Sequence, residues 1–259
     1  METIVNYYDA YEEDIRLIKD KAHEVEFITT INFLNKYINR DTKVLDIGAG
    51  TGRYSFHYAK KGMDITATDL APKHVSIMKE RAIKEGLNLE IFEGNALNLE
   101  NVKDNTFDVV LCLGPLYHLM NEEDRFKCIE ECKRVLKPQG ILAAAYINRF
   151  STFIDMINRD SENINDEGIR KIYIEGKEYE DERDCFYFST VKGIEELMNK
   201  SSIFKLEHIG TDGMGIILKE KINKFNETEF NKWMEYHLET CKEESLLGYS
   251  QHGLFIGRV

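Results

Sequence analysis

A glycine cluster preceded by an acid is the first pattern in this sequence that could do chemistry. In VLDIGAGTGRYS (44–55), Asp46 precedes Gly48, Gly50 and Gly52. Glycine lets the backbone turn sharply and approach a ligand without a Cβ in the way. Open α/β sheets bind ligands at the carboxyl ends of their strands. The segment is therefore a candidate ligand-binding loop after a strand, and a tight turn without a ligand is the alternative.

The spacing of the glycines differs from that of a dinucleotide-binding loop. That fingerprint needs G-x-G-x-x-G, but counting from either of the first two glycines the sixth position holds Arg53 or Ser55. The glycine that lets a helix receive a pyrophosphate is missing, which disfavours a dehydrogenase or another nucleotide-binding enzyme. An acid two residues before the first glycine suits a ligand with a cationic amino-acid end.

A second acid, Asp69, ends the next apolar run. Acids at this place in nucleotide-binding α/β folds accept hydrogen bonds from ribose hydroxyls. Two acids without a phosphate loop fit a nucleoside that carries a positive charge. The sequence therefore predicts S-adenosylmethionine (SAM) as cofactor, rather than NAD or ATP.

Short apolar runs alternate with amphipathic stretches from Lys43 to about Tyr146, as is typical of a parallel sheet covered by helices. The predicted strands are 43–48, 63–69, 87–94, 107–114 and 140–147, and the predicted helices lie near 53–61, 72–86 and 122–137. The last helix begins after Asn121 and stops at 137–140.

The flanking segments carry further elements. Residues 9–39 predict one or two helices, and 149–190 predict a hairpin made of KIYIEG and FYFST. A helix near 191–200, a strand at 203–209, an amphipathic helix near 227–243 and a strand at 252–259 follow. A final hairpin added to five parallel strands would give seven.

These motifs resemble those of a known family. DIGAGTG, Asp69, EGNA, FDVVLCLGPLYHL and RVLKPQGIL resemble the successive motifs of class I SAM-dependent methyltransferases. YYDAYEEDIRL, HEVEF, GPLYHL and LLGYSQHGLFIGR are similar to stand-alone bacterial methyltransferases of mostly unassigned substrate. The resemblance implies a Rossmann-like α/β fold, whose mostly parallel sheet has the strand order 3-2-1-4-5-7-6 with strand seven antiparallel. It also implies flanking helices, N-terminal helices and C-terminal cap insertions.

The resemblance assigns roles by position. Asp46 and the glycine loop would hold the methionine end of SAM, and Asp69 the ribose. Asn95 stands where the family more often has Asp, yet its side-chain oxygen can still accept from the adenine amino group. Leu70 would cover the adenine, and Leu113 would form the wall beside the sulfonium. The expected cofactor-binding set is Asp46, Gly48, Ala49, Gly50, Gly52, Arg53, Asp69, Leu70, Asn95, Ala96, Leu113 and Gly114.

The residues after the fourth predicted strand are candidates for catalysis. Transfer from a sulfonium chiefly requires positioning and exclusion of water. A general base is needed only if the acceptor must lose a proton. His118 is the best-placed base, and it could instead position a ligand or simply pack. Tyr117 has the same alternatives.

The acceptor is predicted to be a small molecule with an O or N nucleophile. The formal net charge of −12 argues against a phosphate backbone as partner. LGPLYH replaces the Asn/Asp-Pro-Pro-Tyr cradle used for exocyclic amines, and no Pro-Cys dipeptide occurs for attack on a pyrimidine. An RNA or protein acceptor, or a SAM-binding protein without turnover, are the alternatives. The oligomeric state stays open.

The N-terminal sequence and the cysteines indicate the cellular compartment. METIVNYYDAYEEDIRLIKD lacks a basic start and an apolar run, and no segment approaches a membrane span, so a cytoplasmic protein without a membrane partner is predicted. Five cysteines without a CxxC pair predict reduced thiols. Cys128 and Cys132 share a helix face, for which we predict core packing and no metal site.

The predicted domains are a helical lid at 1–40 and the methyltransferase domain at 41–259, with cap insertions near 149–190 and 211–250. Within the lid, Asn6 to Arg16 would close over the ligand, since Tyr7, Tyr8 and Tyr11 can cover apolar and cationic surface. A frayed terminus is the alternative.

Overall fold

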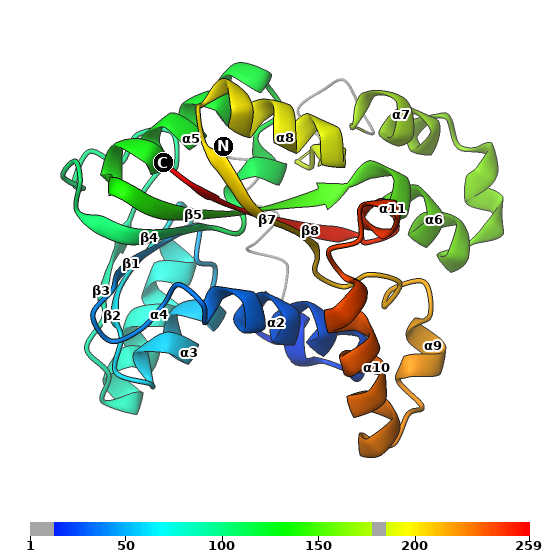
Figure 1. The fold of residues 1–259 in the computed structure, drawn as a ribbon, viewed down its shortest axis with the longest axis horizontal. Coiled ribbons are helices and arrows are strands. Elements are labelled where there is room, and N and C mark those ends of the chain that lie inside the picture. Colours follow the sequence, from blue (N-terminus) through cyan, green and yellow to red (C-terminus); the bar gives the residue numbers. More distant parts are fainter. Residues whose placement is uncertain (1–12, 178–184) are drawn as a thin grey trace.

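The fold is built on one twisted sheet between two layers of helices (Figure 1). The computed structural model describes residues 13–177 and 185–259. The strands are β1 (Lys43–Ile47), β2 (Asp64–Asp69), β3 (Glu90–Glu93), β4 (Phe107–Cys112), β5 (Leu136–Asn148), β6 (Phe188–Ser189), β7 (Phe204–Gly210) and β8 (His252–Arg258).

The strand order is β3-β2-β1-β4-β5-β8-β7, with β6 paired to β5 off this path. The first five strands are parallel, and β8 runs antiparallel to both β5 and β7. The predicted order is confirmed, with β7 and β8 as the sixth and seventh strands of the expected sheet. The sheet has eight strands rather than seven because β6 adds a two-residue parallel pairing to Ile147 and Asn148.

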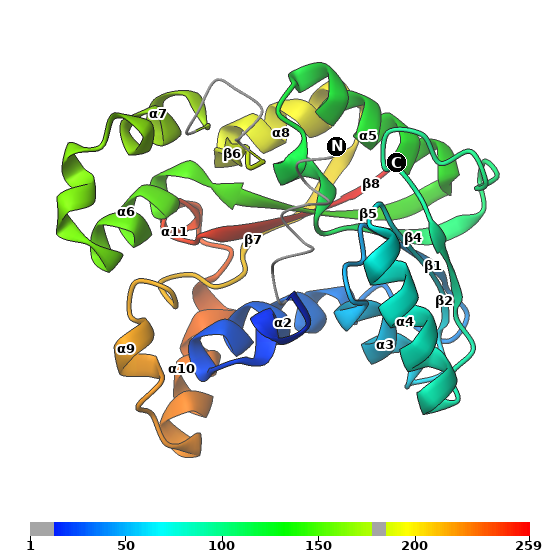
Figure 2. The ribbon, with the colours of Figure 1, turned by 180° about the vertical axis from the view of Figure 1, so that it is seen from behind.

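Helices cover both faces of the sheet (Figures 1 and 2). On one face lie α2 (Lys21–Leu34), α3 (Arg53–Ala59) and α4 (Pro72–Glu85), with α10 (Glu227–Thr240) against α2. On the other lie α5 (Glu122–Val135) and α8 (Val191–Lys200). The remaining elements are η1 (Glu13–Ile18), η2 (Pro115–His118), α6 (Arg149–Arg159), η3 (Ser161–Asn165), α7 (Glu167–Glu175), α9 (Lys219–Ile222) and α11 (Glu244–Leu247).

Alternate residues of the central strands build two apolar cores. Val110 of β4 packs towards α5 and α8, whereas Val109 and Leu111 pack towards α2 and α3. This division follows from the two-residue period of a strand that is buried on both faces. None of the helices within the described residues is long and apolar enough to span a bilayer.

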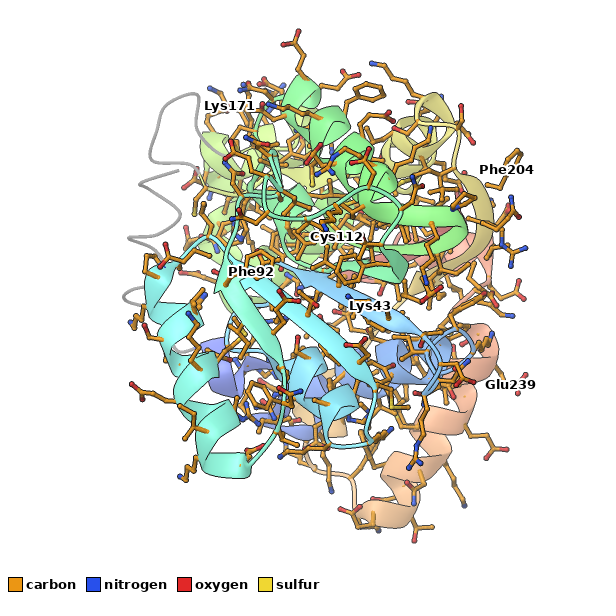
Figure 3. All side chains as sticks on the ribbon, turned by 90° about the vertical axis from the view of Figure 1, so that its left-hand side faces the viewer. Lys43, Phe92, Cys112, Lys171, Phe204 and Glu239 are labelled. Atoms are coloured by element: carbon orange, nitrogen blue, oxygen red, sulfur yellow. The ribbon has the colours of Figure 1, made fainter. Side chains whose placement is uncertain are left out.

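Four of the five cysteines, all except Cys185, belong to these cores. All five are buried free thiols. Cys128 and Cys132 lie on the buried face of α5, and their Sγ atoms lie within 4.8 Å of each other and of Cys112 Sγ. Figure 3 shows Cys112 in the interior, whereas Phe204 and Glu239 lie at the periphery.

The predicted hairpin in 149–190 is wrong. KIYIEG belongs to α7, which begins where Asp166 accepts the backbone N–H groups of Gly168 and Ile169 and ends at Gly176 with φ of +83°. The alternation of Ile172 and Ile174 resembles a strand, but the buried pair is Ile169 and Ile172, which lie three residues apart on one helix face. FYFST supplies β6, which pairs with β5.

The predicted stop of the third core helix is also displaced. The helix ends at Val135, and β5 begins at Leu136 rather than at Gly140. Leu136 pairs with Phe107 of β4, and the register shifts before the next pairs. Gln139 takes a positive φ of +67° in this irregular stretch, so the turn signal falls within the strand.

Candidate functional site

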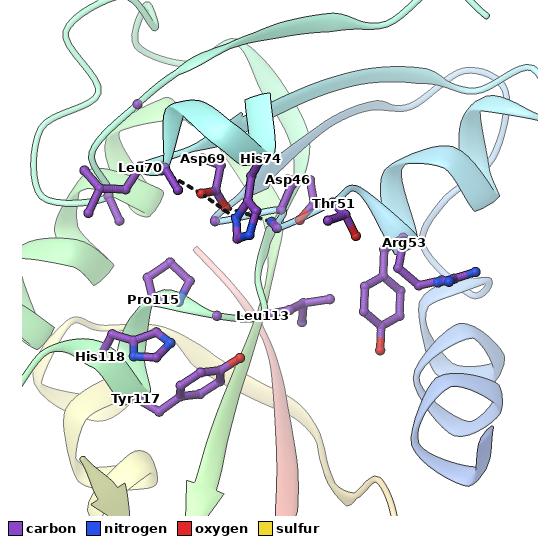
Figure 4. Close-up of a pocket in the computed structure, with 18 of the residues that line it drawn as sticks. Asp46, Thr51, Arg53, Asp69, Leu70, His74, Leu113, Pro115, Tyr117 and His118 are labelled. Carbon is purple, nitrogen blue, oxygen red and sulfur yellow. Dashed lines mark hydrogen bonds and ion pairs between the residues drawn. The ribbon is translucent and has the colours of Figure 1, made fainter. Parts of the chain in front are cut away.

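A cavity opens at the carboxyl ends of β1, β2 and β4 (Figure 4). Of the predicted cofactor-binding set, all but Gly52 line it, and so do both catalytic candidates. The predicted residues on its wall are Asp46, Gly48, Ala49, Gly50, Arg53, Asp69, Leu70, Asn95, Ala96, Leu113, Gly114, Tyr117 and His118. Gly52 is not part of this wall and directly precedes α3.

The glycine loop has a backbone that requires glycine. Gly48 has φ of +66°, and a Cβ there would lie 2.9 Å from the ring of Pro115. Gly52 has φ of +83°, and a Cβ there would lie 2.8 Å from the ring of Phe56. Positive φ values are strained for residues with a Cβ. The loop is therefore held close to β1 and to the segment after β4, with its backbone facing the cavity.

Asp46 is a buried acid at the end of β1. Its side chain accepts the hydroxyl of Ser55 at 2.6 Å, and the residue is 2% exposed. Burial, with a further contribution from the nearby Asp69, raises the pKa of Asp46 to about 7. A cationic ligand group at this place would favour the charged carboxylate.

Asp69 ends β2, and its carboxylate contacts the glycine loop, the backbone of Ala71 and the first turn of α4. Its Oδ2 accepts the backbone N–H of Gly50 at 2.7 Å. Its Oδ1 accepts the N–H of Ala71 at 2.8 Å and faces Nδ1 of His74 at 3.1 Å. A carboxylate has about four acceptor positions, so a ribose hydroxyl can share Oδ2. Asp69 thus also orients the glycine loop, a role that the sequence analysis did not assign.

The turn after β3 supplies another part of the cavity wall. Asn95 and Ala96, for which a contact with adenine is predicted, line the cavity, and so does Leu97. Asn95 Oδ1 accepts the N–H of Leu97 at 2.9 Å, so one lone pair of this oxygen already stabilises the turn. An adenine amino group would have to use its second lone pair.

His118 ends η2, directly after β4. Its Nδ1 lies 2.7 Å from the carbonyl oxygen of Cys185, and since a carbonyl can only accept, Nδ1 carries the proton. Burial lowers the pKa of His118 to about 4. The imidazole is therefore neutral near pH 7, with Nε2 as its acceptor atom. The rings of Tyr117 and Phe186 pack against it, with centroids 4.8 and 4.9 Å away.

Several cavity residues were missed by the sequence analysis. His74, in the first turn of α4, contacts Asp69, and a histidine shortly after that acid was the available signal. Tyr54 and Pro115 adjoin predicted residues. Leu17 comes from η1, more than twenty residues before β1, and directly follows Arg16, the last residue of the predicted lid segment. Asn6, Tyr7, Tyr8 and Tyr11 of the predicted lid lie outside the described residues. Among the described residues of that segment, Arg16 lines the cavity.

Comparison with known proteins agrees with this geometry. Residues 44–140 match the family described as "Methyltransferase domain". A ubiquinone biosynthesis O-methyltransferase of Pasteurella multocida is 31% identical over 116 residues, which cover 41% of this chain and 47% of that protein. The chain thus spans about half the length of such curated relatives.

Two further proteins match over longer stretches. An uncharacterized protein of Methanocaldococcus jannaschii is 30% identical over 166 residues, which cover 62% of this chain and 68% of that protein. The structure of a SAM-dependent methyltransferase from Methanosarcina mazei superposes with a TM-score of 0.58 at 19% identity, over 87% of this chain and 96% of that one. The strand order, the glycine loop and these matches together show that the chain belongs to the class I SAM-dependent methyltransferases.

Proposed function

We propose that this chain transfers the methyl group of SAM to an O or N nucleophile of a small organic molecule. The observation that carries the proposal is a single cavity that joins two unlike ends. One end holds the glycine loop and two acids, Asp46 and Asp69, and the other holds Tyr117 and His118.

The residues at the first end fit SAM. The buried carboxyl of Asp46, whose pKa is raised to about 7, suits the ammonium of the methionine part. Asp69 would accept from the ribose, while Leu70, Asn95 and Ala96 would surround the adenine. When bound, SAM supplies a methyl group already activated by the positive sulfur.

The protein's own contribution would be to position the acceptor and take up its proton. His118 Nε2 is the acceptor atom of a neutral, partly buried imidazole, and it can take the proton of a hydroxyl as the new bond forms. Leu113, Pro115 and Tyr117 would exclude water from the same space.

The class of acceptor is supported by three observations. The P. multocida relative is named for O-methylation in ubiquinone biosynthesis. The net charge of −12 disfavours a polyanionic partner. Near His118, the ring of Tyr117 lines the cavity and is backed by the stacked ring of Phe186, which provides an aromatic wall suited to an organic molecule. An RNA or protein acceptor and a SAM-binding protein without turnover are the alternatives.

A screen for the acceptor tests the proposal. The protein and radiolabelled SAM are incubated in separate reactions with a metabolite extract, an RNA extract and a protein extract. The Asp69→Ala protein is the matched control in each reaction. We expect label in the metabolite fraction that depends on Asp69. Label confined to RNA or protein would identify one of the alternative acceptors, and SAM binding without any transfer would favour the non-catalytic alternative.

The charge of Asp46 should make SAM binding depend on pH. Because its pKa is raised to about 7, Asp46 is ionised above that pH and loses its charge as the pH falls. SAM affinity is therefore expected to fall about tenfold from pH 8 to pH 6. Calorimetry at several pH values would measure it. Asp46→Asn should bind more weakly and lose most of this dependence, whereas equal affinity of the parent at both pH values contradicts the role of Asp46.

The lid stays a prediction. Arg16 is the last residue of the predicted lid segment, and Leu17 directly follows it. Both line the cavity, which supports a lid formed by the N-terminal part of the chain. The boundary between residues 1–40 and the rest of the chain is likewise a proposal.

A further inference from the structure

Three buried thiols meet in the core between the sheet and α5. Cys112 is the last residue of β4 and lies in the interior of the molecule (Figure 3), whereas Cys128 and Cys132 share the buried face of α5. The Sγ atoms of Cys112 and Cys128 are 3.8 Å apart, and all three Sγ atoms lie within 4.8 Å of one another. Because Cys112 comes from a different element, the spacing of the cysteines along the chain does not reveal this third thiol.

The distances between the sulfurs suit a single atom bound among them. An atom bonded to three sulfurs at about 2.3 Å, the length of a zinc–thiolate bond, holds them roughly 3.5 to 4.0 Å apart, depending on the bond angle. The separation of Cys112 and Cys128 is already in that range, and the other two would shorten by about one ångström at most. Small changes in the side-chain torsions can supply this movement.

The surroundings favour a soft centre that takes sulfur ligands only. All three cysteines are 0% exposed, and the side chains packed around them include those of Leu116 and Ile129. Thiolates are soft ligands and select thiophilic centres. A tetrahedral zinc ion would need a fourth ligand. Within the described part of the chain, the group of His, Cys, Asp and Glu side chains at this place consists of the three cysteines, so a three-coordinate centre fits better.

The apolar core also discriminates between centres of different charge. Three thiolates around a divalent ion carry a net negative charge, and it is costly to bury a net charge away from water. A trivalent centre gives a neutral complex. Trivalent arsenic reaches it by a balanced exchange, As(OH)3 + 3 Cys–SH → As(S–Cys)3 + 3 H2O. Three As–O and three S–H bonds break while three As–S and three O–H bonds form, and neither a net proton nor an electron is transferred.

We propose that Cys112, Cys128 and Cys132 form a binding site for a trivalent thiophilic centre, for which arsenite is the probe. The site goes beyond the proposed function, because the cavity wall includes Leu113 and Gly114 but none of the three cysteines. Arsenic held there would be a bound ligand and not the methyl acceptor. Because the site is closed, α5 must open transiently to admit arsenite, so we expect slow binding that mild denaturant accelerates.

Titration of the full, reduced chain with arsenite tests the site. Native mass spectrometry should show one bound arsenic per chain, with three hydrogens lost. X-ray absorption at the arsenic edge should show three sulfur neighbours and no oxygen neighbour. The melting temperature should rise with the arsenite concentration. Because no proton is released, arsenite affinity should stay constant from about pH 6 to pH 8, whereas binding of Cd²⁺ must release thiol protons and should strengthen as the pH rises.

Alanine variants identify the ligands. Cys112→Ala, Cys128→Ala and Cys132→Ala should each weaken arsenite binding about a hundredfold or more, because only two linked sulfurs remain. Cys241→Ala is the matched control, since Cys241 is also a buried free thiol but belongs to the other apolar core. It should bind arsenite as tightly as the parent does.

Undiminished binding by folded Cys112→Ala protein overturns the inference, and so does a loss of binding in folded Cys241→Ala protein. If the alanine variants do not fold, the X-ray absorption spectrum of the parent still decides, because oxygen neighbours or fewer than three sulfurs exclude the site. A parent that binds no arsenite shows that the three thiols only pack the core. Calorimetry with SAM tests the proposed function separately, whatever the result with arsenite.

Discussion

Replacing His118 with asparagine is expected to lower turnover about a hundredfold while SAM affinity changes by less than about threefold. The asparagine Nδ2–H can occupy the place of the imidazole Nδ1–H and keep the bond to the Cys185 carbonyl, which now spans 2.7 Å. It offers no atom at the place of Nε2. The variant therefore removes the proton acceptor and leaves the local hydrogen bond. Turnover would be measured with the acceptor identified by the labelling screen.

The pH profile of the parent enzyme provides the complementary measurement. Burial lowers the pKa of His118 to about 4, so Nε2 has its lone pair at all higher pH values and loses it as the pH falls through about 4. The contribution of His118 to turnover should thus be constant from about pH 5 to 8, rather than declining below the usual imidazole pKa of about 6.5. An asparagine variant with the parental turnover would leave His118 with a packing role only.

Replacing Asp69 with alanine is expected to weaken SAM binding about ten- to a hundredfold. The loss has two causes, because the carboxylate would accept from the ribose and also accepts the N–H of Gly50, which holds the glycine loop. His74 would lose its buried partner as well. Calorimetry with SAM and with its demethylated product would measure the change.

A conservative variant separates the two causes. Asp69→Asn keeps one oxygen acceptor and loses the charge, so it should bind SAM with an affinity between those of the parent and Asp69→Ala. Circular dichroism and thermal unfolding would verify that each variant is folded. If folded Asp69→Ala protein binds SAM as tightly as the parent does, the cofactor site has been assigned wrongly.

The sheet and the part of the cavity around the glycine loop could be predicted because their signals are local. Each central strand is a short apolar run, and the acids Asp46 and Asp69 stand where adjacent parallel strands end. Parallel pairing then brings those ends to one edge without further information. The positive φ of Gly48 likewise follows from the residue type in its own segment.

Other features depend on contacts between distant segments, which one sequence does not reveal. The pair of Arg16 and Glu26 needs the packing of η1 on α2, and the pair of Asp212 and His252 needs the final strand in place. The hairpin expectation failed for a related reason. The alternation of Ile172 and Ile174 is typical of a strand, but it spans too few residues to exclude a helix. The N-cap formed by the Asp166 side chain favours the helix.

The position of β8 constrains the order in which the molecule can be assembled on the ribosome. This strand lies between β5 and β7, so residues 252–258 must be synthesised before the sheet can close. Until then, Ile141 to Tyr146 of β5 present an unpaired edge that can recruit strands from other chains. The ion pair of Glu26 with His252 likewise cannot form until His252, more than two hundred residues later in the chain, has been synthesised. The nascent chain therefore passes through an aggregation-prone stage, and chaperones that shield strand edges should increase the yield of active protein.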